Sequence, residues 1–353
     1  MLEALTRQLA GGTALTDDQV AAAIPLLVAE DVAAEAKAAF LTALARKGET
    51  VAEIAAFARG LREYSLRPPL DDTVRARGIL DVVGTGGDRL NTFNISTSAA
   101  LVAAAAGVTV AKHGNRAITS RSGSADVLEA LGIRIDLDPA QAAEWLRAHG
   151  FAFFFAPRYH PAFKQIAPAR KLCAERGQRT IFNFLGPLLN PARPAALLLG
   201  VPRPDLCEPI ARVLQSLGAR RGMVVCGAAP AGGAAACMDE LSTLGPTTVA
   251  EFYQERGLAC STLEPGLFPV RPAALEDLVG GDAAGNARLV RQVLAGEDRG
   301  PRRDAVLLNA AAALLVAGRA RSMAEGWELA AGVIDDGRAA AKLESLVRAG
   351  ASA

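Results

Sequence analysis

A glycine-rich segment near residue 84 holds the residues of this chain best suited to bind a phosphate group. The stretch Asp81 to Gly107 reads DVVGTGGDRLNTFNISTSAALVAAAAG, an apolar run followed by three glycines and then by a helix of small residues. Glycines let the backbone approach a ligand closely, and the free N–H groups at the start of a helix favour an anion. The segment therefore predicts a site for a phosphorylated ligand.

The glycine spacing differs from that of two familiar phosphate-binding loops. A dinucleotide-binding loop would need a glycine where Arg89 stands and an acidic residue about 20 positions further on, where this chain is apolar. A nucleoside-triphosphate loop would end in Gly-Lys-Ser or Gly-Lys-Thr, which does not follow here. For the loop taken alone, a tight turn before a capped helix is the alternative.

A second group of polar residues follows the next apolar run, VTVAKHG. It offers cations, an amide and hydroxyls before another helix, and its members are Lys112, His113, Asn115, Arg116, Ser120, Arg121, Ser122 and Ser124. The carboxyl ends of neighbouring parallel strands lie on one edge of a sheet, where open α/β sheets bind ligands. We therefore expect both groups to face one ligand.

The elements that must position these residues are of two kinds. Residues 1–68 read as helices, with capping boxes in TDDQ and TVAE and a break at Pro68 and Pro69. From about residue 78, short apolar runs alternate with helical segments, which predicts an α/β fold with a central, mostly parallel sheet flanked by helices. The expected strands are ILDVVG, VTVAKHG, IRIDLD, FAFFFAP, AALLLGV and GMVVCG. The glycines expected to end helices are Gly107, Gly132, Gly150 and Gly218.

Composition argues against several classes of protein. With 353 residues, 51% hydrophobic and 21% charged, the chain reads as a compact folded protein. A net charge of +1 without a basic run argues against a nucleic-acid partner. We find no signal peptide and no apolar span of about 20 residues, so no membrane segment is expected. Five scattered cysteines argue against a disulfide framework or a zinc site, and a cytoplasmic protein is expected.

Eight motifs along the chain resemble those of the anthranilate phosphoribosyltransferases and occur in the order found in that family. They are DVVGTGGD, NIST, KHGNR, SGSADVLEALG, APRYHP, IFNFLGPLLNPARP, MDELS and RDAVLLNAAAAL. The resemblance implies a small all-helical domain, residues 1–68 completed by about 162–184, beside an α/β phosphoribosyl-binding domain formed by 69–161 and 185–353. It also implies a homodimer formed through the helical domain.

The family transfers the phosphoribosyl group of 5-phosphoribosyl 1-diphosphate (PRPP) to the amine of anthranilate, releasing pyrophosphate, in tryptophan biosynthesis. Asp88, itself an anion, suits the ribose hydroxyls or a metal-bound water better than a phosphate. The residues that the resemblance implies for PRPP are Gly84, Gly87, Asp88, Thr92, Asn94, Ile95, Ser96, Thr97, Lys112, Asn115, Arg116, Ser120 and Ser124.

The same resemblance implies sites for anthranilate and for Mg²⁺. The anthranilate residues are Gly84, His113, Asn115, Tyr159, Arg170 and Pro187, with Phe163 a further candidate for the apolar slot. Arg170 would approach the carboxylate, and His113 would orient anthranilate or be structural. Mg²⁺, as two ions of which at least one arrives with PRPP, is expected on Ser96, Asp239 and Glu240. A solvated acidic turn is the alternative for the Asp-Glu pair.

No residue is expected to act as a general base. An aromatic amine is already neutral at pH near 7, so catalysis would rest on alignment of the substrates and stabilisation of the leaving group. The chain departs from the family pattern by about three extra residues between Arg170 and Thr180, most of a helical turn. Leu189 and Cys237 also replace a usual Thr and a usual Gly.

Two other functions stay open from the sequence. A pyrimidine nucleoside phosphorylase shares the fold, although its KxS-type signature is missing here. A non-catalytic relative that binds nucleic acid would be basic and would lack the metal and anthranilate residues.

Overall fold

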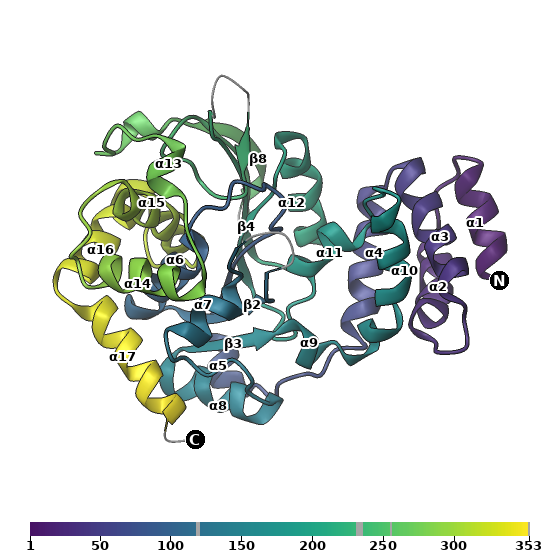
Figure 1. The fold of residues 1–353 in the computed structure, drawn as a ribbon, viewed down its shortest axis with the longest axis horizontal. Helices are drawn as coiled ribbons and strands as arrows, with labels where there is room; N and C mark the ends of the chain where they lie inside the picture. The colour runs from purple at the N-terminus through teal and green to yellow at the C-terminus, as the bar shows by residue number, and fades with distance from the viewer. Residues whose placement is uncertain (118–120, 231–235, 255, 352–353) are drawn as a thin grey trace.

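A bundle of helices packs beside a larger α/β part in the computed structural model of the chain (Figure 1). The structure describes residues 1–117, 121–230, 236–254 and 256–351. The bundle contains α1 (Leu2–Ala10), α2 (Asp17–Val28), α3 (Ala34–Lys47) and α4 (Val51–Arg62). Both predicted capping boxes are confirmed, since the side chains of Thr16 and Thr50 accept hydrogen bonds from the backbone of Gln19 and Glu53.

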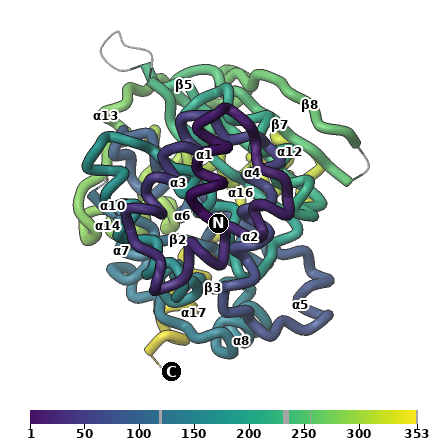
Figure 2. Tube along the Cα trace, turned by 90° about the vertical axis from the view of Figure 1, so that its right-hand side faces the viewer, coloured from purple at the N-terminus to yellow at the C-terminus, as the bar shows by residue number. Residues whose placement is uncertain are grey.

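A helical segment from the middle of the chain joins this bundle. It consists of α9 (Ala156–Tyr159), the 3₁₀ helix η1 (Pro161–Gln165), α10 (Ala167–Glu175) and α11 (Phe182–Leu188). α10 packs against α3 and α11 against α4, and Figure 2 shows α10 next to α3. The bounds of a separate helical domain stay a prediction, because the apolar core of the bundle continues onto one face of the sheet through Leu197 and Leu199.

The sheet of the described residues contains eight strands and is mixed but mostly parallel. The parallel strands lie in the order β3 (Phe151–Phe155), β2 (Thr109–Gly114), β1 (Ile79–Gly84), β4 (Ala196–Gly200) and β5 (Arg221–Ala228). The antiparallel members are β7 (Thr247–Tyr253), β8 (Arg256–Leu263) and the short β6 (Cys237–Met238), which pairs with β5. This order confirms the predicted fold class.

Helices cover both faces of the sheet. On one face lie α6 (Ile95–Ala105) and α15 (Pro301–Val316), backed by α14 (Ala283–Leu294), α16 (Met323–Asp335) and α17 (Arg338–Ala351) (Figure 1). On the other face α12 (Cys207–Ser216), which follows η2 (Pro204–Leu206), packs on β5 and β7. Four of the five alanines of α6 are buried, and small side chains let this helix lie close to β1 and β2.

Shorter helices complete the α/β part. They are α5 (Asp72–Ala76), α7 (Ser124–Ala130), α8 (Pro139–His149), η3 (Pro265–Leu267) and α13 (Leu275–Leu278). The four glycines expected to end helices, Gly107, Gly132, Gly150 and Gly218, all have positive φ, which confirms that prediction. In the described parts of the chain, no helix has both the length and the apolar character needed to cross a bilayer.

One predicted strand is wrong. Residues 133–138, IRIDLD, form an irregular segment between α7 and α8, although the structure describes all six. Ile133, Ile135 and Leu137 do alternate into the core, so the pattern reports their burial correctly. The Leu137 carbonyl accepts a hydrogen bond from a side chain, the Tyr159 hydroxyl, at 3.0 Å. Alternating burial alone therefore does not require a strand.

Candidate active site

A cavity of about 710 Å³ lies between the carboxyl ends of β1 and β2 and the helical segment α9–α11. The sheet contributes the loop Gly84–Gly87 and residues His113–Asn115 to its wall. The helical segment contributes His160, Phe163, Arg170, Phe182 and Pro187. The cavity therefore joins the two groups of residues that the sequence singled out.

The glycine loop that follows β1 packs against the segment that carries the acidic pair, Asp239 and Glu240. The Gly86 N–H donates to Asp239 Oδ2 at 2.5 Å. A Cβ atom at Gly84 would lie 2.6 Å from the same oxygen, and one at Gly200 would overlap the Asp239 backbone. Glycine is thus required at both strand ends because the acidic segment passes directly over them.

The acidic pair also contacts the start of α6. The Ser96 N–H donates to Glu240 Oε1 at 3.0 Å, and the Ser96 hydroxyl bonds the same carboxylate. Burial, with Asp88 and Glu240 nearby, raises the pKa of Asp239 well above its ordinary value. Burial raises the pKa of Glu240 to about 7, against the opposing effect of Lys112. The pair is therefore not a solvated turn, and its crowded negative charge suits a divalent cation.

The donors available for such a cation are all oxygens. Mg²⁺ prefers carboxylates and hydroxyls together with substrate phosphates, so Asp239, Glu240 and Ser96 fit it. Among the described residues, no group of three or more His, Cys, Asp or Glu side chains forms a metal site by itself. A cation here would need further ligands from a substrate.

Lys112 lies behind the acidic pair and does not line the cavity. Its side chain is buried, and Nζ donates to the Val82 carbonyl at 2.6 Å. Burial lowers the pKa of the ammonium, while the charges of Asp81 and Glu240 raise it. Lys112 is thus a counter-charge to these carboxylates, and its predicted direct contact with a phosphate stays a prediction.

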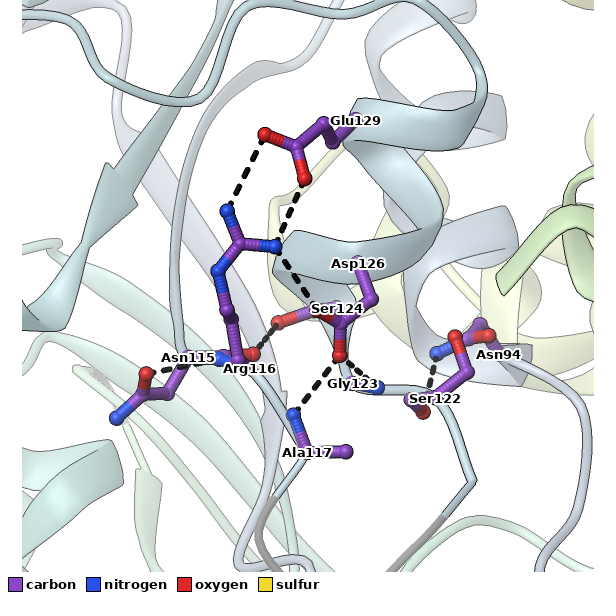
Figure 3. A network of polar contacts seen from close by, with 9 residues as sticks. All are labelled: Asn94, Asn115, Arg116, Ala117, Ser122, Gly123, Ser124, Asp126 and Glu129. Atoms are coloured by element: carbon purple, nitrogen blue, oxygen red, sulfur yellow. Dashed lines mark hydrogen bonds and ion pairs between the residues drawn. The ribbon is translucent and has the colours of Figure 1, made fainter. Parts of the chain in front are cut away.

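The segment after Lys112 is held by its own contacts (Figure 3). The Arg116 guanidinium pairs with Asp126 at 3.0 Å and with Glu129 at 2.8 Å, so in this structure it is directed at α7. The Asn115 side chain accepts from the backbone N–H of Arg116 at 2.8 Å, and the Asn115 backbone carbonyl accepts from the Ser124 hydroxyl at 3.4 Å. The predicted residue Ser120 lies outside the described residues.

The remaining residues predicted for PRPP lie on the glycine loop and around the start of α6. Gly87 lines the cavity, while Asp88 accepts from the Leu90 N–H through its own carboxylate. Thr92 forms an isolated β-bridge with Val279, and Ile95 is buried. The Asn94 amide donates to the Ser122 carbonyl at 3.4 Å and accepts from Asn286 at 2.9 Å.

Three buried hydroxyls near these loops have no hydrogen-bond partner in the described structure. They belong to Thr85 on the glycine loop, Thr97 on α6 and Ser122 before α7. Buried hydroxyls are nearly always bonded, so these three suit an oxygen-rich ligand. Thr97 was predicted, whereas Thr85 and Ser122 were not among the residues assigned to PRPP. The sequence signal that could have identified Thr85 and Ser122 is their position in loops that are expected to bind phosphate.

The opposite end of the cavity is aromatic and basic, since Arg170, Lys171 and Arg179 of the helical segment line it. The Arg170 guanidinium lies 5.3 Å from the centre of the Phe182 ring, and burial lowers its pKa. Within the described residues it has no carboxylate partner. Pro187 and Phe163 line the same end, as expected. A half-buried guanidinium without a counter-charge suits a ligand carboxylate.

Two histidines line the same cavity. His113 Nε2 and His160 Nε2 are 3.2 Å apart, and both side chains are buried. Burial and the neighbouring ring lower the pKa of His113 to about 3, and burial lowers that of His160 to about 4. Both rings are therefore neutral near pH 7. His160 was missed as a site residue, although its motif APRYHP had been noted.

Tyr159 does not line the cavity. Its side chain is fully buried against Phe154, and its hydroxyl donates to Leu137. α9 directs Tyr159 into the core and the following His160 toward the cavity, so nothing in this structure supports the predicted contact of Tyr159 with anthranilate, which stays a prediction.

Comparison with known proteins agrees with this geometry. Residues 76–340 match the family described as "Glycosyl transferase family, a/b domain", and residues 3–65 match its "helical bundle domain". Anthranilate phosphoribosyltransferases of Rubrobacter xylanophilus and Symbiobacterium thermophilum are 45% and 47% identical, covering 99% and 98% of this chain and 97% and 96% of the relatives.

Solved structures give the same result. The anthranilate phosphoribosyltransferase of Thermus thermophilus has a TM-score of 0.86 and 44% identity, with 98% of each chain covered. The Saccharomyces cerevisiae enzyme in complex with PRPP and Mg has a TM-score of 0.87 and 28% identity, with 100% of this chain and 98% of that chain covered. The chain belongs to the glycosyl transferase family of the anthranilate phosphoribosyltransferases.

Proposed function

We propose that this protein transfers the phosphoribosyl group of PRPP to the amine of anthranilate, giving N-(5-phosphoribosyl)anthranilate and pyrophosphate, in tryptophan biosynthesis. One observation carries the proposal: a single cavity has two unlike ends. Backbone donors and unpaired hydroxyls at the sheet edge suit phosphates. An unpaired guanidinium among aromatic rings suits the carboxylate of an aromatic acid. Each end therefore accepts one of the two substrates.

The sheet edge binds PRPP in this proposal. The loop Gly84–Gly87 and the first turn of α6 supply N–H donors, and Thr85 and Thr97 supply hydroxyls. Asp239, Glu240 and Ser96 hold Mg²⁺, two ions with at least one arriving with PRPP. When bound, Mg²⁺ supplies positive charge that stabilises the departing pyrophosphate. Lys112 balances the acidic pair from behind.

The helical segment binds anthranilate. Arg170 holds the carboxylate, and Phe163, Phe182 and Pro187 form the walls of a flat slot. Because the two histidines that line the cavity are neutral, they do not compete with Arg170 for the carboxylate. The amine is neutral and needs no prior deprotonation, so catalysis rests on holding it against C1 of the sugar.

Two further points belong to the proposal. The protein forms a homodimer through the helical bundle, and it is cytoplasmic. Light scattering after size-exclusion chromatography tests the first point, since a mass of one chain would reject it.

A fluorescence assay tests the function. Anthranilate fluorescence is followed with PRPP and Mg²⁺, with and without a chelator, and pyrophosphate is measured in parallel. We expect anthranilate to disappear with release of one equivalent of pyrophosphate, and only with the metal. Stable fluorescence, or base release from uridine and phosphate instead, would reject the proposal in favour of another activity.

A further inference from the structure

The pairing of β1 with β2 stops early along both strands. Over these fully described strands, the register joins Ile79 to Thr109 and Leu80 to Val110 and goes no further. By contrast, β1 pairs with β4, and β2 with β3, over five residues each. The ladder between β1 and β2 is therefore missing at the end of the strands that borders the cavity.

Backbone groups at that end bond to side chains and not to the neighbouring strand. The bonds of a parallel ladder are evenly spaced, so its next ones would use the backbone of Val82, Ala111 and His113. The Val82 carbonyl instead accepts from Lys112 Nζ at 2.6 Å. The Ala111 carbonyl and the His113 N–H bond to a buried pair of side chains.

The buried pair consists of Asp81 on β1 and Asn190, which follows α11. Asn190 Nδ2 donates to the Ala111 carbonyl at 2.7 Å and to Asp81 Oδ2 at 2.8 Å. Asp81 Oδ1 accepts from the His113 N–H at 3.2 Å, and the Ala192 N–H donates to Asn190 Oδ1 at 2.9 Å. Both side chains are fully buried, where a hydrogen bond is costly to lose. The pair is thus a fixed insert between the two strands.

This insert connects the parts of the chain that form the cavity. β1 continues from Asp81 into the loop Gly84–Gly87, and the end of β2 contributes His113–Asn115. Shortly before Asn190, α11 contributes Pro187 to the aromatic end. The pair therefore lies where the loop expected to bind PRPP and the wall expected to bind anthranilate meet.

We propose that Asp81 and Asn190 are positioning residues, which hold β1 and β2 apart and so set the spacing of the two substrates. This inference rests on the proposed function. In the structure as described, neither side chain lines the cavity, so both act through the backbone of the strands. A pair that only stabilised the fold would affect unfolding and leave substrate binding unchanged.

The test exchanges the two side chains. Asn190→Asp puts a second carboxylate against Asp81, and Asp81→Asn leaves one amide oxygen for two donors. The double variant, Asp81→Asn with Asn190→Asp, again has one carboxylate and one amide, and only the Ala111 carbonyl lacks its donor. We expect each single variant to raise the KM of both PRPP and anthranilate about tenfold, and the double variant to recover most of this loss.

Leu346→Ala is the control for lost stability. It removes a buried apolar side chain from α17, no residue of which lines the described cavity. It should lower the midpoint of thermal unfolding and leave both KM values unchanged. Circular dichroism checks the fold of every variant, and if Asn190→Asp does not fold, Asp81→Asn and the double variant decide. Unchanged KM values in the folded single variants, or a double variant no better than these, would overturn the inference.

Calorimetric titration of inorganic pyrophosphate with Mg²⁺ separates this inference from the proposed function. A wild type that consumes no anthranilate would end the proposed function, and pyrophosphate affinity then replaces the KM values in the same comparison. We expect about tenfold weaker binding in each single variant and recovery in the double variant. Equal affinity in all of them would overturn the inference, and no binding by the wild type would end both proposals.

Discussion

The two ends of the cavity carry ionisable groups of opposite charge. At the sheet edge, the buried Asp239 and the half-buried Glu240 lie close together, and the pKa values of their carboxyl groups are raised. At the helical end, the Arg170 guanidinium has no carboxylate partner among the described residues and its pKa is lowered by burial. Each end thus carries a charge that the folded chain does not fully balance. Unbalanced buried charge is costly, so its presence at both ends indicates what each ligand must bring.

The ends also differ in which atoms do the binding. In the proposed function the backbone makes most of the contacts with the phosphates, so the sheet edge depends on glycines and on the direction of α6. In the proposed function the aromatic acid contacts side chains of the helical segment, Arg170, Phe163 and Phe182, which line the cavity. Substitutions at the two ends should therefore affect different substrates.

The largest effect is expected from Asp239→Ala combined with Glu240→Ala. Loss of the metal ligands should lower turnover roughly a hundredfold or more, because several kcal/mol of charge stabilisation is removed. Steady-state kinetics at saturating substrate measures this. The exposed pair Glu276 and Asp277 gives a matched double-alanine control that should keep full turnover. Unchanged kinetics in the site variant would refute the metal role.

Arg170→Ala should impair binding of one substrate only, and so distinguish the two ends of the cavity. We expect the anthranilate KM to rise by roughly 10- to 100-fold, the loss of one charge-assisted hydrogen-bonded contact, with little change in the PRPP KM. Lys164→Ala, at an exposed cation on η1, is the control and should change neither KM. A rise confined to the PRPP KM would reverse the assignment of the ends.

Gly200→Ala tests the close packing at the sheet edge. A Cβ there overlaps the Asp239 backbone, so we expect the free energy of unfolding to fall by about 1–3 kcal/mol and Mg²⁺-dependent pyrophosphate binding to weaken. Gly332→Ala, inside α16 with open space around it, should instead raise stability by roughly 0.5–1 kcal/mol. Denaturant unfolding of both proteins gives the comparison, and equal stability would contradict it.

The smallest effect is expected for the histidine pair, which should change the free energy of unfolding only at acidic pH. The pKa values of His113 and His160 lie near 3 and 4 when folded, below the ordinary 6.5. The unfolded chain therefore binds more protons below about pH 6.5, and the pair loses stability as pH falls from there toward 4, up to about 2 kcal/mol for each ring at pH 5. Unfolding of wild type and His160→Gln at pH 7 and 5 tests this. A wild-type acid sensitivity no greater than that of the variant would reject it.

The glycine loop and the start of α6 were predictable because their signals are local. Glycines after an apolar run and hydroxyls before a small-residue helix need no knowledge of distant segments. The β7–β8 hairpin gave no such signal, since β8 is an edge strand with mostly exposed residues and no apolar run. The error at residues 133–138 has the opposite cause, because burial alternated there without a strand.

Side-chain roles that depend on distant segments were harder to predict. Lys112 was expected at the phosphates, but its position is set by Val82, Asp81 and Glu240, which come from two other parts of the chain. Tyr159 and His160 are neighbours that point to different places, and nothing in the sequence fixes where the turn after α9 begins. Arg170 was placed by its motif alone, and only the fold brings it to the cavity wall.

A crystal structure with PRPP, Mg²⁺ and benzoate, an aromatic acid without the reacting amine, tests the division of the cavity most directly. We predict the diphosphate at the Gly84–Gly87 loop and the first turn of α6, with the benzoate carboxylate against Arg170. Benzoate at the glycine loop, or a PRPP phosphate on Arg170, would contradict it.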